Sequence, residues 1–208
     1  MTHPASNSPD CLIFDLFGVV VAFEDELVYQ RLASYCSEPI AASREMHDLV
    51  STPSLICGKT PFKTFHSDLV GKYGLNLSLQ AFAEIWRESY SEPMPGMRDL
   101  LRQLQGQCRL VLLSNIDPFY WSTVEANLPE LQAFDALALS FEQGFAKPDL
   151  RAFERAVSMS GTNVKGCLFI DDKPENIDAA AQVGIAGHVF AGCANLKQIL
   201  RTRGLQVR

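Results

Sequence analysis

Apolar residues along the chain follow two different periodicities, which change from one segment to the next. The run Cys11-Leu12-Ile13-Phe14 leads directly into Asp15 and is typical of a buried strand with a carboxylate at its C-terminal end. Farther along, apolar residues recur at helical spacing in four stretches, at about 25–35, 40–50, 61–70 and 78–90. This pattern predicts one strand followed by an all-helical segment with no further strand before residue 93.

Two prolines and a glycine, Pro93, Pro95 and Gly96, mark a change of pattern. Beyond them, short apolar runs alternate with amphipathic stretches. The runs predict strands at 109–114, 136–140, 167–170 and 187–190, and the stretches predict helices at 97–105, 117–127, 149–159 and 174–184. Repeated strand–helix units are typical of an α/β fold with a doubly wound parallel sheet.

Composition narrows the class of protein. The chain has 208 residues, of which 47% are hydrophobic, and a net charge of -6, so it can bury a core and lacks a basic footprint for nucleic acid. Apolar runs are too short to span a membrane, and Met1 to Pro9 does not resemble a secretion signal. The six cysteines form no C-x-x-C pair, which favours reduced thiols and a cytoplasmic location. Residues 201–208 are expected to form a frayed tail.

Four of the predicted strands are followed by residues that carry chemistry. These residues are Asp15, Ser114 with Asn115, Lys147, and Asp171 with Asp172. In open α/β sheets, ligands bind outside the carboxyl ends of the strands. Taken singly, such residues have plainer explanations. Lys147 is typical of a solvated surface lysine, and one of Asp171 and Asp172 is suited to cap the helix at Pro174. Together they predict a site at one edge of the sheet.

Three carboxylates at one edge repel one another and raise one another's pKa unless a cation lies between them. Mg²⁺ is the natural occupant, because it binds carboxylates, carbonyl oxygens and substrate phosphate. Asp15 held in this way remains ionised and is able to attack phosphorus. Lys147 and the hydroxyl of Ser114 are suited to hold phosphoryl oxygens.

Four segments resemble, in order, the four motifs of the haloacid dehalogenase-like hydrolases: Asp15-Leu16-Phe17-Gly18-Val19, Ser114-Asn115, Lys147-Pro148-Asp149 and Phe169-Ile170-Asp171-Asp172-Lys173-Pro174-Glu175-Asn176. The resemblance implies a Rossmann-like core (10–20 and 93–208) and an α-helical cap (21–92). It further implies Asp15 as nucleophile, with Lys147 and Ser114 binding phosphate and Asn115 shaping the pocket. The implied Mg²⁺ site comprises Asp15, the backbone carbonyl of Phe17 and the acid pair Asp171–Asp172.

One position departs from the family pattern. Phosphatases of the family carry a second aspartate as general acid–base where this chain has Phe17, and losing such a group costs about 10²–10⁴-fold in rate. Three interpretations follow. The first is a phosphatase, for example of a sugar phosphate, that favours leaving groups needing little protonation, such as those of a sugar 1-phosphate, an acyl phosphate or an aryl phosphate. The others are a metal-independent 2-haloacid dehalogenase and a non-enzymatic protein that binds phosphorylated ligands. The acid pair argues against the dehalogenase, and we predict the phosphatase.

The sequence leaves the specificity of the site open. Arg44, His47, Lys59 and Arg87 are the polar candidates in the predicted cap, each with a surface role as the plainer explanation. Asp171, Glu24 and Asp25 are candidates for the missing proton transfer, and His188 is expected to be structural. We expect a small-molecule substrate and a monomer or homodimer.

Overall fold

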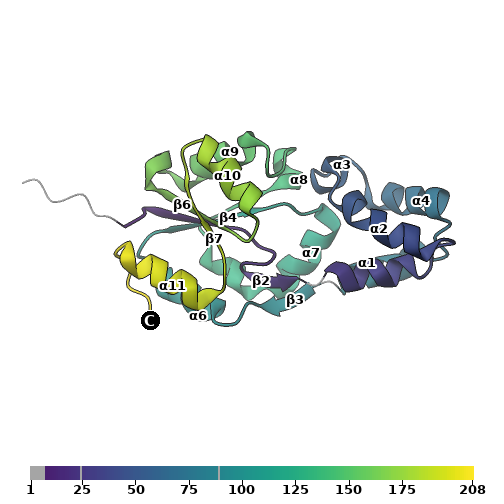
Figure 1. Cartoon of the computed structure of the whole chain (residues 1–208), viewed down its shortest axis with the longest axis horizontal. Helices are drawn as coiled ribbons and strands as arrows, with labels where there is room; N and C mark the ends of the chain where they lie inside the picture. Colours follow the sequence, from purple (N-terminus) through teal and green to yellow (C-terminus); the bar gives the residue numbers. More distant parts are fainter. Residues whose placement is uncertain (1–7, 24, 89) are drawn as a thin grey trace, which may run out of the picture.

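The computed structural model describes residues 8–23, 25–88 and 90–208 (Figure 1). A sheet of five parallel strands lies at its centre, in the order β5-β4-β1-β6-β7. The strands are β1 (Cys11–Phe14), β4 (Arg109–Ser114), β5 (Ala136–Leu139), β6 (Cys167–Asp171) and β7 (Ala186–Val189). The predicted doubly wound α/β fold is therefore confirmed, with strand boundaries within a residue of those predicted from the apolar runs.

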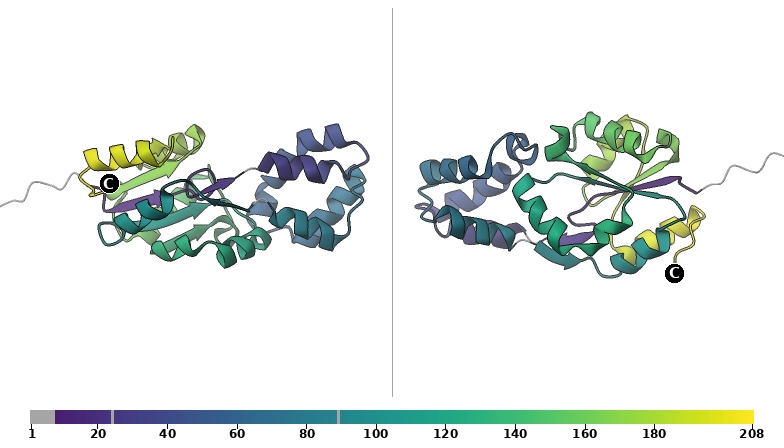
Figure 2. Two further views of the ribbon diagram at one scale, coloured as in Figure 1. Left: turned by 90° about the horizontal axis from the view of Figure 1, so that it is seen from below. Right: turned by 180° about the vertical axis from the view of Figure 1, so that it is seen from behind.

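Helices cover both faces of the sheet and also form a separate group at one end of the molecule (Figures 1 and 2). Those packed around the sheet are α6 (Met97–Leu104), α7 (Pro118–Asn127), α8 (Ser140–Gln143), α9 (Leu150–Ser160), α10 (Pro174–Gln182) and α11 (Cys193–Thr202), with short 3₁₀ turns at Pro129–Ala133 and Val164–Gly166. The separate group comprises α1 (Asp25–Ala33), α2 (Pro39–Val50), α3 (Pro53–Ile56), α4 (Phe62–Tyr73) and α5 (Leu79–Arg87).

The central strand β1 is buried on both faces because its side chains alternate between two hydrophobic clusters. Cys11 and Ile13 pack with residues of α9 and α10, whereas Leu12 and Phe14 pack with residues of α6, α7 and α11. Alternation follows from the two-residue period of a strand, and fully burying such a side chain contributes about 1.5–3 kcal/mol. A strand with both faces covered has to be apolar throughout, as this run is.

The position of β1 in the sheet explains where the polar strand ends meet. The chain passes from β1 to β4 and β5 on one side, and then returns to β6 and β7 on the other side. Such a reversal opens a crevice at the carboxyl ends of the strands beside the reversal. Asp15, Ser114 and Asp171 terminate or directly follow the three adjacent strands β1, β4 and β6.

The segment predicted to be wholly helical also contains strands. Val21–Phe23 (β2) and Tyr90–Pro93 (β3) pair as a two-stranded antiparallel ribbon where the chain leaves and re-enters the sheet region. Both strands are too short for a two-residue periodicity to be recognised in the sequence. The prediction that no strand occurs between residues 21 and 92 was therefore wrong.

The C-terminus differs from the expected frayed tail. It follows α11, a helix that the sequence analysis did not predict. Leu205 and Val207 are buried, and the backbone N–H groups of Gln206 and Arg208 donate to the side chains of Gln107 and Gln103. Burial of two apolar side chains together with paired backbone groups keeps this segment on the core.

Smaller boundary differences have local causes. The helix predicted at 61–70 begins at Phe62, and it continues through Gly71 to Tyr73. Gly74 adopts the left-handed conformation (φ 62°) that commonly terminates helices. Ser140, predicted as the end of a strand, instead begins α8.

Two predictions from composition can be compared with the structure. All six cysteines are free thiols, as predicted. Across the described ranges, no helix is long and apolar enough to cross a bilayer.

Candidate active site

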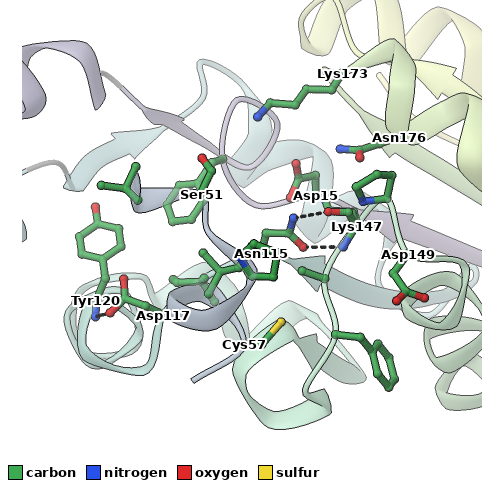
Figure 3. Close-up of a pocket in the computed structure, with 18 of the residues that line it drawn as sticks. Asp15, Ser51, Cys57, Asn115, Asp117, Tyr120, Lys147, Asp149, Lys173 and Asn176 are labelled. Atoms are coloured by element: carbon green, nitrogen blue, oxygen red, sulfur yellow. Dashed lines mark hydrogen bonds and ion pairs between the residues drawn. The ribbon is translucent and has the colours of Figure 1, made fainter. Parts of the chain in front are cut away.

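A cavity of about 800 Å³ lies at the carboxyl ends of the central strands, between the sheet and helices of the separate group (Figure 3). Five of the predicted site residues line it: Asp15, Phe17, Asn115, Lys147 and Asp172. Ser114 and Asp171 are fully buried behind this lining. The strand ends thus form a single site, although its members differ in their access to the cavity.

An ammonium group shared by two carboxylates forms the centre of the site. Lys147 Nζ lies 2.7 Å from Asp15 Oδ1 and 2.7 Å from Asp171 Oδ2. The side chain of Lys147 is only 2% exposed, that of Asp15 9% and that of Asp171 0%. The interpretation of Lys147 as a solvated surface lysine is therefore wrong.

Burial and charge act in opposite directions on these three groups. Burial raises the pKa of Asp15 to about 7, although the Lys147 ammonium acts to lower it. Burial alone would lower the pKa of Lys147, but the two carboxylates hold that pKa above its ordinary value. Burial likewise acts to raise the pKa of Asp171, but Lys147 and the hydrogen bonds to its carboxylate hold that pKa below its usual range. Lys147 is thus charged in the folded protein.

Two asparagines fix the positions of this triad. Asn115 donates from Nδ2 to the carbonyl of Lys147 and accepts from the Lys147 N–H, each over 2.8 Å. The Nδ2 of Asn176 donates to both Asp171 oxygens at 3.0 Å, and the Lys173 N–H donates to Asp171 Oδ1. Asn176 ends the fourth family-like segment of the sequence, but nothing in its spacing reveals that its side chain turns back onto β6.

Asp172 faces the same cavity with a different set of neighbours. Its Oδ1 is buried without a hydrogen-bond partner among the described residues. Burial raises the pKa of Asp172, and the charge of Asp171 adds to the shift. The loop after β1 comes so close that a Cβ on Gly18, whose φ is 79°, would lie 2.5 Å from Asp172 Oδ2. Glycine at this position lets the loop and the carboxylate share the site.

One ligand atom from each of Asp15, Asp171 and Asp172 lies within 4.8 Å of the others. A single ammonium does not balance three carboxylates at this spacing, so the cluster retains negative charge where the cavity begins. Oxygen donors in such an arrangement are suited to a hard divalent cation. The donor set therefore fits the metal that the sequence analysis expected.

Phe17 and Ser114 contribute very different surfaces. The ring of Phe17 lines the cavity and stacks on Tyr120, with 5.8 Å between ring centroids and 26° between planes. The hydroxyl of Ser114 is buried and has no hydrogen-bond partner within the described part of the chain. Of these two side chains, only that of Ser114 carries a hydroxyl, because the ring of Phe17 is apolar and has no proton to transfer.

Most of the remaining polar candidates lie elsewhere. Lys59 lines the cavity, but Arg44 is exposed away from it and Arg87 lies over the ring of Phe119, 4.5 Å from its centroid. His188 is part of β7 and does not line the cavity. Glu24 falls outside the described residues, as do the side chains of Asp25 and His47.

Two contacts that the sequence did not reveal join the separate helices to the core on either side of the cavity. Trp86 Nε1 donates to Asp117 Oδ2 over 3.3 Å, while Asp117 Oδ1 caps α7 by accepting two backbone N–H groups. On the other side, Ser140 Oγ donates to the carbonyl of Ile56 over 2.5 Å. The sequence predicted Asp117 as a helix cap, but not its second partner.

Comparison with known proteins agrees with this architecture. The family model of the haloacid dehalogenase-like hydrolases matches residues 9–184, and the chain belongs to this family of hydrolases. The solved structure of a HAD family enzyme from Bacteroides thetaiotaomicron in a magnesium complex is similar, with a TM-score of 0.80 and 22% identity. The match covers 93% of this chain and 99% of that one, and it confirms the Rossmann-like fold with its inserted helices.

Two curated relatives are more similar to this chain in sequence than that structure is. Sesquiterpene phosphatase astK of Aspergillus oryzae is 33% identical over 52% of this chain, and the match spans 58% of that protein, less than two thirds of its length. Flavin mononucleotide hydrolase 1 of Arabidopsis thaliana is 27% identical over 94% of this chain and 78% of its own length. The first of these is named as a phosphatase, and the second as a hydrolase of flavin mononucleotide.

The shared ammonium yields a test of stability. We expect Lys147→Met to lower the free energy of unfolding by about 3 kcal/mol at pH 8 in EDTA, because two buried carboxylates lose their counter-charge. Their folded pKa values then lie above that of an unfolded aspartate, so the folded state binds more protons and stability falls as pH rises. The loss should accordingly be smaller at pH 5, as measured by urea unfolding.

The exposed Lys165 offers a matched control. Lys165→Met should change the free energy of unfolding by less than about 0.5 kcal/mol at either pH. A loss in Lys147→Met that matches this control, or one that does not vary with pH, would contradict the buried charge arrangement.

Proposed function

We propose that the chain is a magnesium-dependent phosphatase, which transfers the phosphoryl group of a small phosphorylated molecule first to Asp15 and then to water. The observation that carries the proposal is the buried Asp15 carboxylate, which ends the central strand, faces the cavity and lies 2.7 Å from Lys147 Nζ. Membership of the hydrolase family and the names of the two curated relatives support the same reaction class.

Each step has a residue suited to it. An Asp15 oxygen attacks phosphorus, the bond from phosphorus to the leaving-group oxygen breaks, and that oxygen takes a proton from solvent water, because Phe17 has none to give. Water then attacks the phosphorus of the aspartyl phosphate, which releases phosphate and restores Asp15. Lys147 offsets charge on the phosphoryl oxygens, and the buried hydroxyl of Ser114 is a further donor for them. Asn115 holds the backbone of Lys147 and so orients its ammonium.

For the magnesium site we assign Asp15, Asp172 and the backbone carbonyl of Phe17 as direct ligands. Asp171 belongs to the same acidic cluster, but both of its oxygens already accept hydrogen bonds, so we assign it to positioning Lys147. The buried, unpartnered Asp172 Oδ1 supports the assignment of that residue. When bound, Mg²⁺ orients the phosphoryl group and offsets its charge.

We further propose that residues 21–92 act as a cap over a core of residues 10–20 and 93–208. Residues of α1, α2, α3 and α5 supply one side of the cavity, whereas the chemically active groups come from the strand ends. The contacts of Trp86 with Asp117 and of Ile56 with Ser140 would hold such a cap in place over the site.

The nucleophile and metal are tested together. With Mg²⁺, the protein should release phosphate from p-nitrophenyl phosphate, and Asp15→Asn should lower kcat by at least about 10³-fold because no oxygen nucleophile remains. Excess EDTA should have a comparable effect on the wild-type protein. The exposed Asp178 provides a control, since Asp178→Asn should leave kcat unchanged.

Other outcomes would identify the alternatives. Halide release from 2-chloropropionate without metal, and no phosphate release, would assign the chain to the dehalogenases. Phosphate release that survives in Asp15→Asn would refute the proposed nucleophile. An absence of both products would favour a protein that only binds phosphorylated ligands.

Phe17 makes a separate prediction about leaving groups. A site without a proton donor should prefer phosphates of acidic alcohols, such as aryl phosphates, over simple alkyl phosphates. Phe17→Asp should therefore raise kcat/KM for an alkyl phosphate by about tenfold or more, with little change for p-nitrophenyl phosphate. Phe17→Asn is the matched control, because asparagine resembles aspartate in size and polarity but does not transfer a proton. Equal effects of the two variants, or a wild-type preference for alkyl phosphates, would contradict the prediction.

A further inference from the structure

Beyond the carboxylates, the cavity has a wall that is mainly hydrocarbon. Helices of the proposed cap and the loop after β4 contribute its apolar members, and we call this surface the apolar wall: Val28, Val50, Ile56, Cys57, Trp86 and Ile116. All except the half-buried Ile56 are at most 7% exposed, so they belong to the interior of the cavity rather than to the outer surface. Small-molecule sites of this kind bind the ligand body through apolar contact.

Several polar groups near the apolar wall are occupied by the protein itself, whereas Ser51, Lys59, Lys173 and Glu175 also line the cavity. The Asp117 carboxylate accepts hydrogen bonds from Trp86 Nε1 and from two backbone N–H groups of α7. Asp149 and Arg151, at another part of the lining, pair with each other. A sugar bound against the apolar wall would lose hydrogen bonds to water without regaining them, which is unfavourable for each hydroxyl left unpaired.

The aromatic pair beside the carboxylates extends the same apolar surface. Phe17, which follows the nucleophilic strand end, stacks on Tyr120, and both rings line the cavity. A leaving group bonded to a phosphoryl group at Asp15 would therefore meet apolar and aromatic side chains both near the reacting bond and farther out. A cavity of about 800 Å³ is larger than a phosphoryl group alone requires and falls within the usual range for small-molecule sites.

We infer that the substrate is the phosphate monoester of a predominantly apolar alcohol or phenol, whose hydrocarbon body packs on the apolar wall. The apolar wall acts on binding, whereas the missing proton donor at Phe17 favours the more acidic members of this class in turnover. This inference rests on the proposed phosphatase activity and adds the class of leaving group to it. Sugar phosphates were among the candidates suggested by the sequence, and the lining of the cavity favours a different class. A hydrophobic pocket discriminates by about a factor of ten or more between ligands that differ by one methylene group. A difference in affinity between apolar and polar phosphate esters should therefore be readily measurable.

Cyclohexylmethyl phosphate and glucose 6-phosphate form a suitable pair, because both carry a six-membered ring on a primary phosphate ester and differ chiefly in ring polarity. Binding is measured by calorimetry to full-length Asp15→Asn protein with Mg²⁺, so that turnover does not interfere. We expect the cyclohexylmethyl ester to have a Kd at least about tenfold lower and a more negative heat-capacity change on binding. Equal affinity, tighter binding of glucose 6-phosphate, or binding of neither compound would overturn the inference.

A pair of threonine variants links the preference to the apolar wall. Val50→Thr, prepared in the Asp15→Asn background, adds a hydroxyl of nearly the same shape to the lining and should narrow the ratio of the two Kd values by about 3- to 10-fold. Val70→Thr is the control, because Val70 is also helical but is 41% exposed and does not line the cavity. An unchanged ratio in Val50→Thr protein that unfolds at the same urea concentration as its parent would overturn the role of the apolar wall.

Failure of this inference is distinct from failure of the proposed function. If p-nitrophenyl phosphate is hydrolysed and glucose 6-phosphate binds more tightly, the phosphatase stands and the apolar substrate class falls. If no phosphate is released from p-nitrophenyl phosphate, the proposed function fails whatever the two Kd values show.

Discussion

A lysine ammonium buried between two carboxylates is the interaction on which the rest of the site depends. Removing three ionised side chains from water is unfavourable unless they are paired and hydrogen-bonded. Lys147 satisfies Asp15 and Asp171 at once, and Asn176 occupies the remaining positions around Asp171. Asp171 can then be wholly buried while Asp15 reaches the cavity. The same geometry places two similar aspartates differently: Asp171 contacts the lysine behind the lining, and Asp15 faces the cavity.

The fold explains how these groups come together. Residues 11–15, 114–115, 147 and 171–172 are far apart in the sequence, yet the parallel sheet brings the carboxyl ends of β1, β4 and β6 side by side. The buried strands give the site a rigid base. The inserted helices then close over it through a few contacts, among them the stack of Phe62 on Phe119, whose ring centroids lie 3.8 Å apart. The carboxylates and most of the apolar lining of the cavity thus come from different parts of the chain.

Much of the core was predictable because buried parallel strands require uninterrupted apolar runs, and the run before Asp15 is a clear example. Proximity of Asp15, Lys147 and the acid pair followed from the same reasoning. Contacts between distant segments were not predictable: neither Trp86 with Asp117 nor the docking of Val207 at the C-terminus leaves a periodic signal. Likewise, spacing could not reveal that Asn115 lines the cavity whereas the neighbouring Ser114 is wholly buried.

Among the three clustered carboxylates, we propose that Asp15 accepts the phosphoryl group. Borohydride reduces an aspartyl phosphate to homoserine, so quenching the enzyme with it during turnover and sequencing the peptides by mass spectrometry identifies the phosphorylated residue. We expect homoserine at position 15 only when magnesium and a phosphate ester are both present. Homoserine at position 171 or 172, or phosphate release with all three aspartates unmodified, would contradict the account.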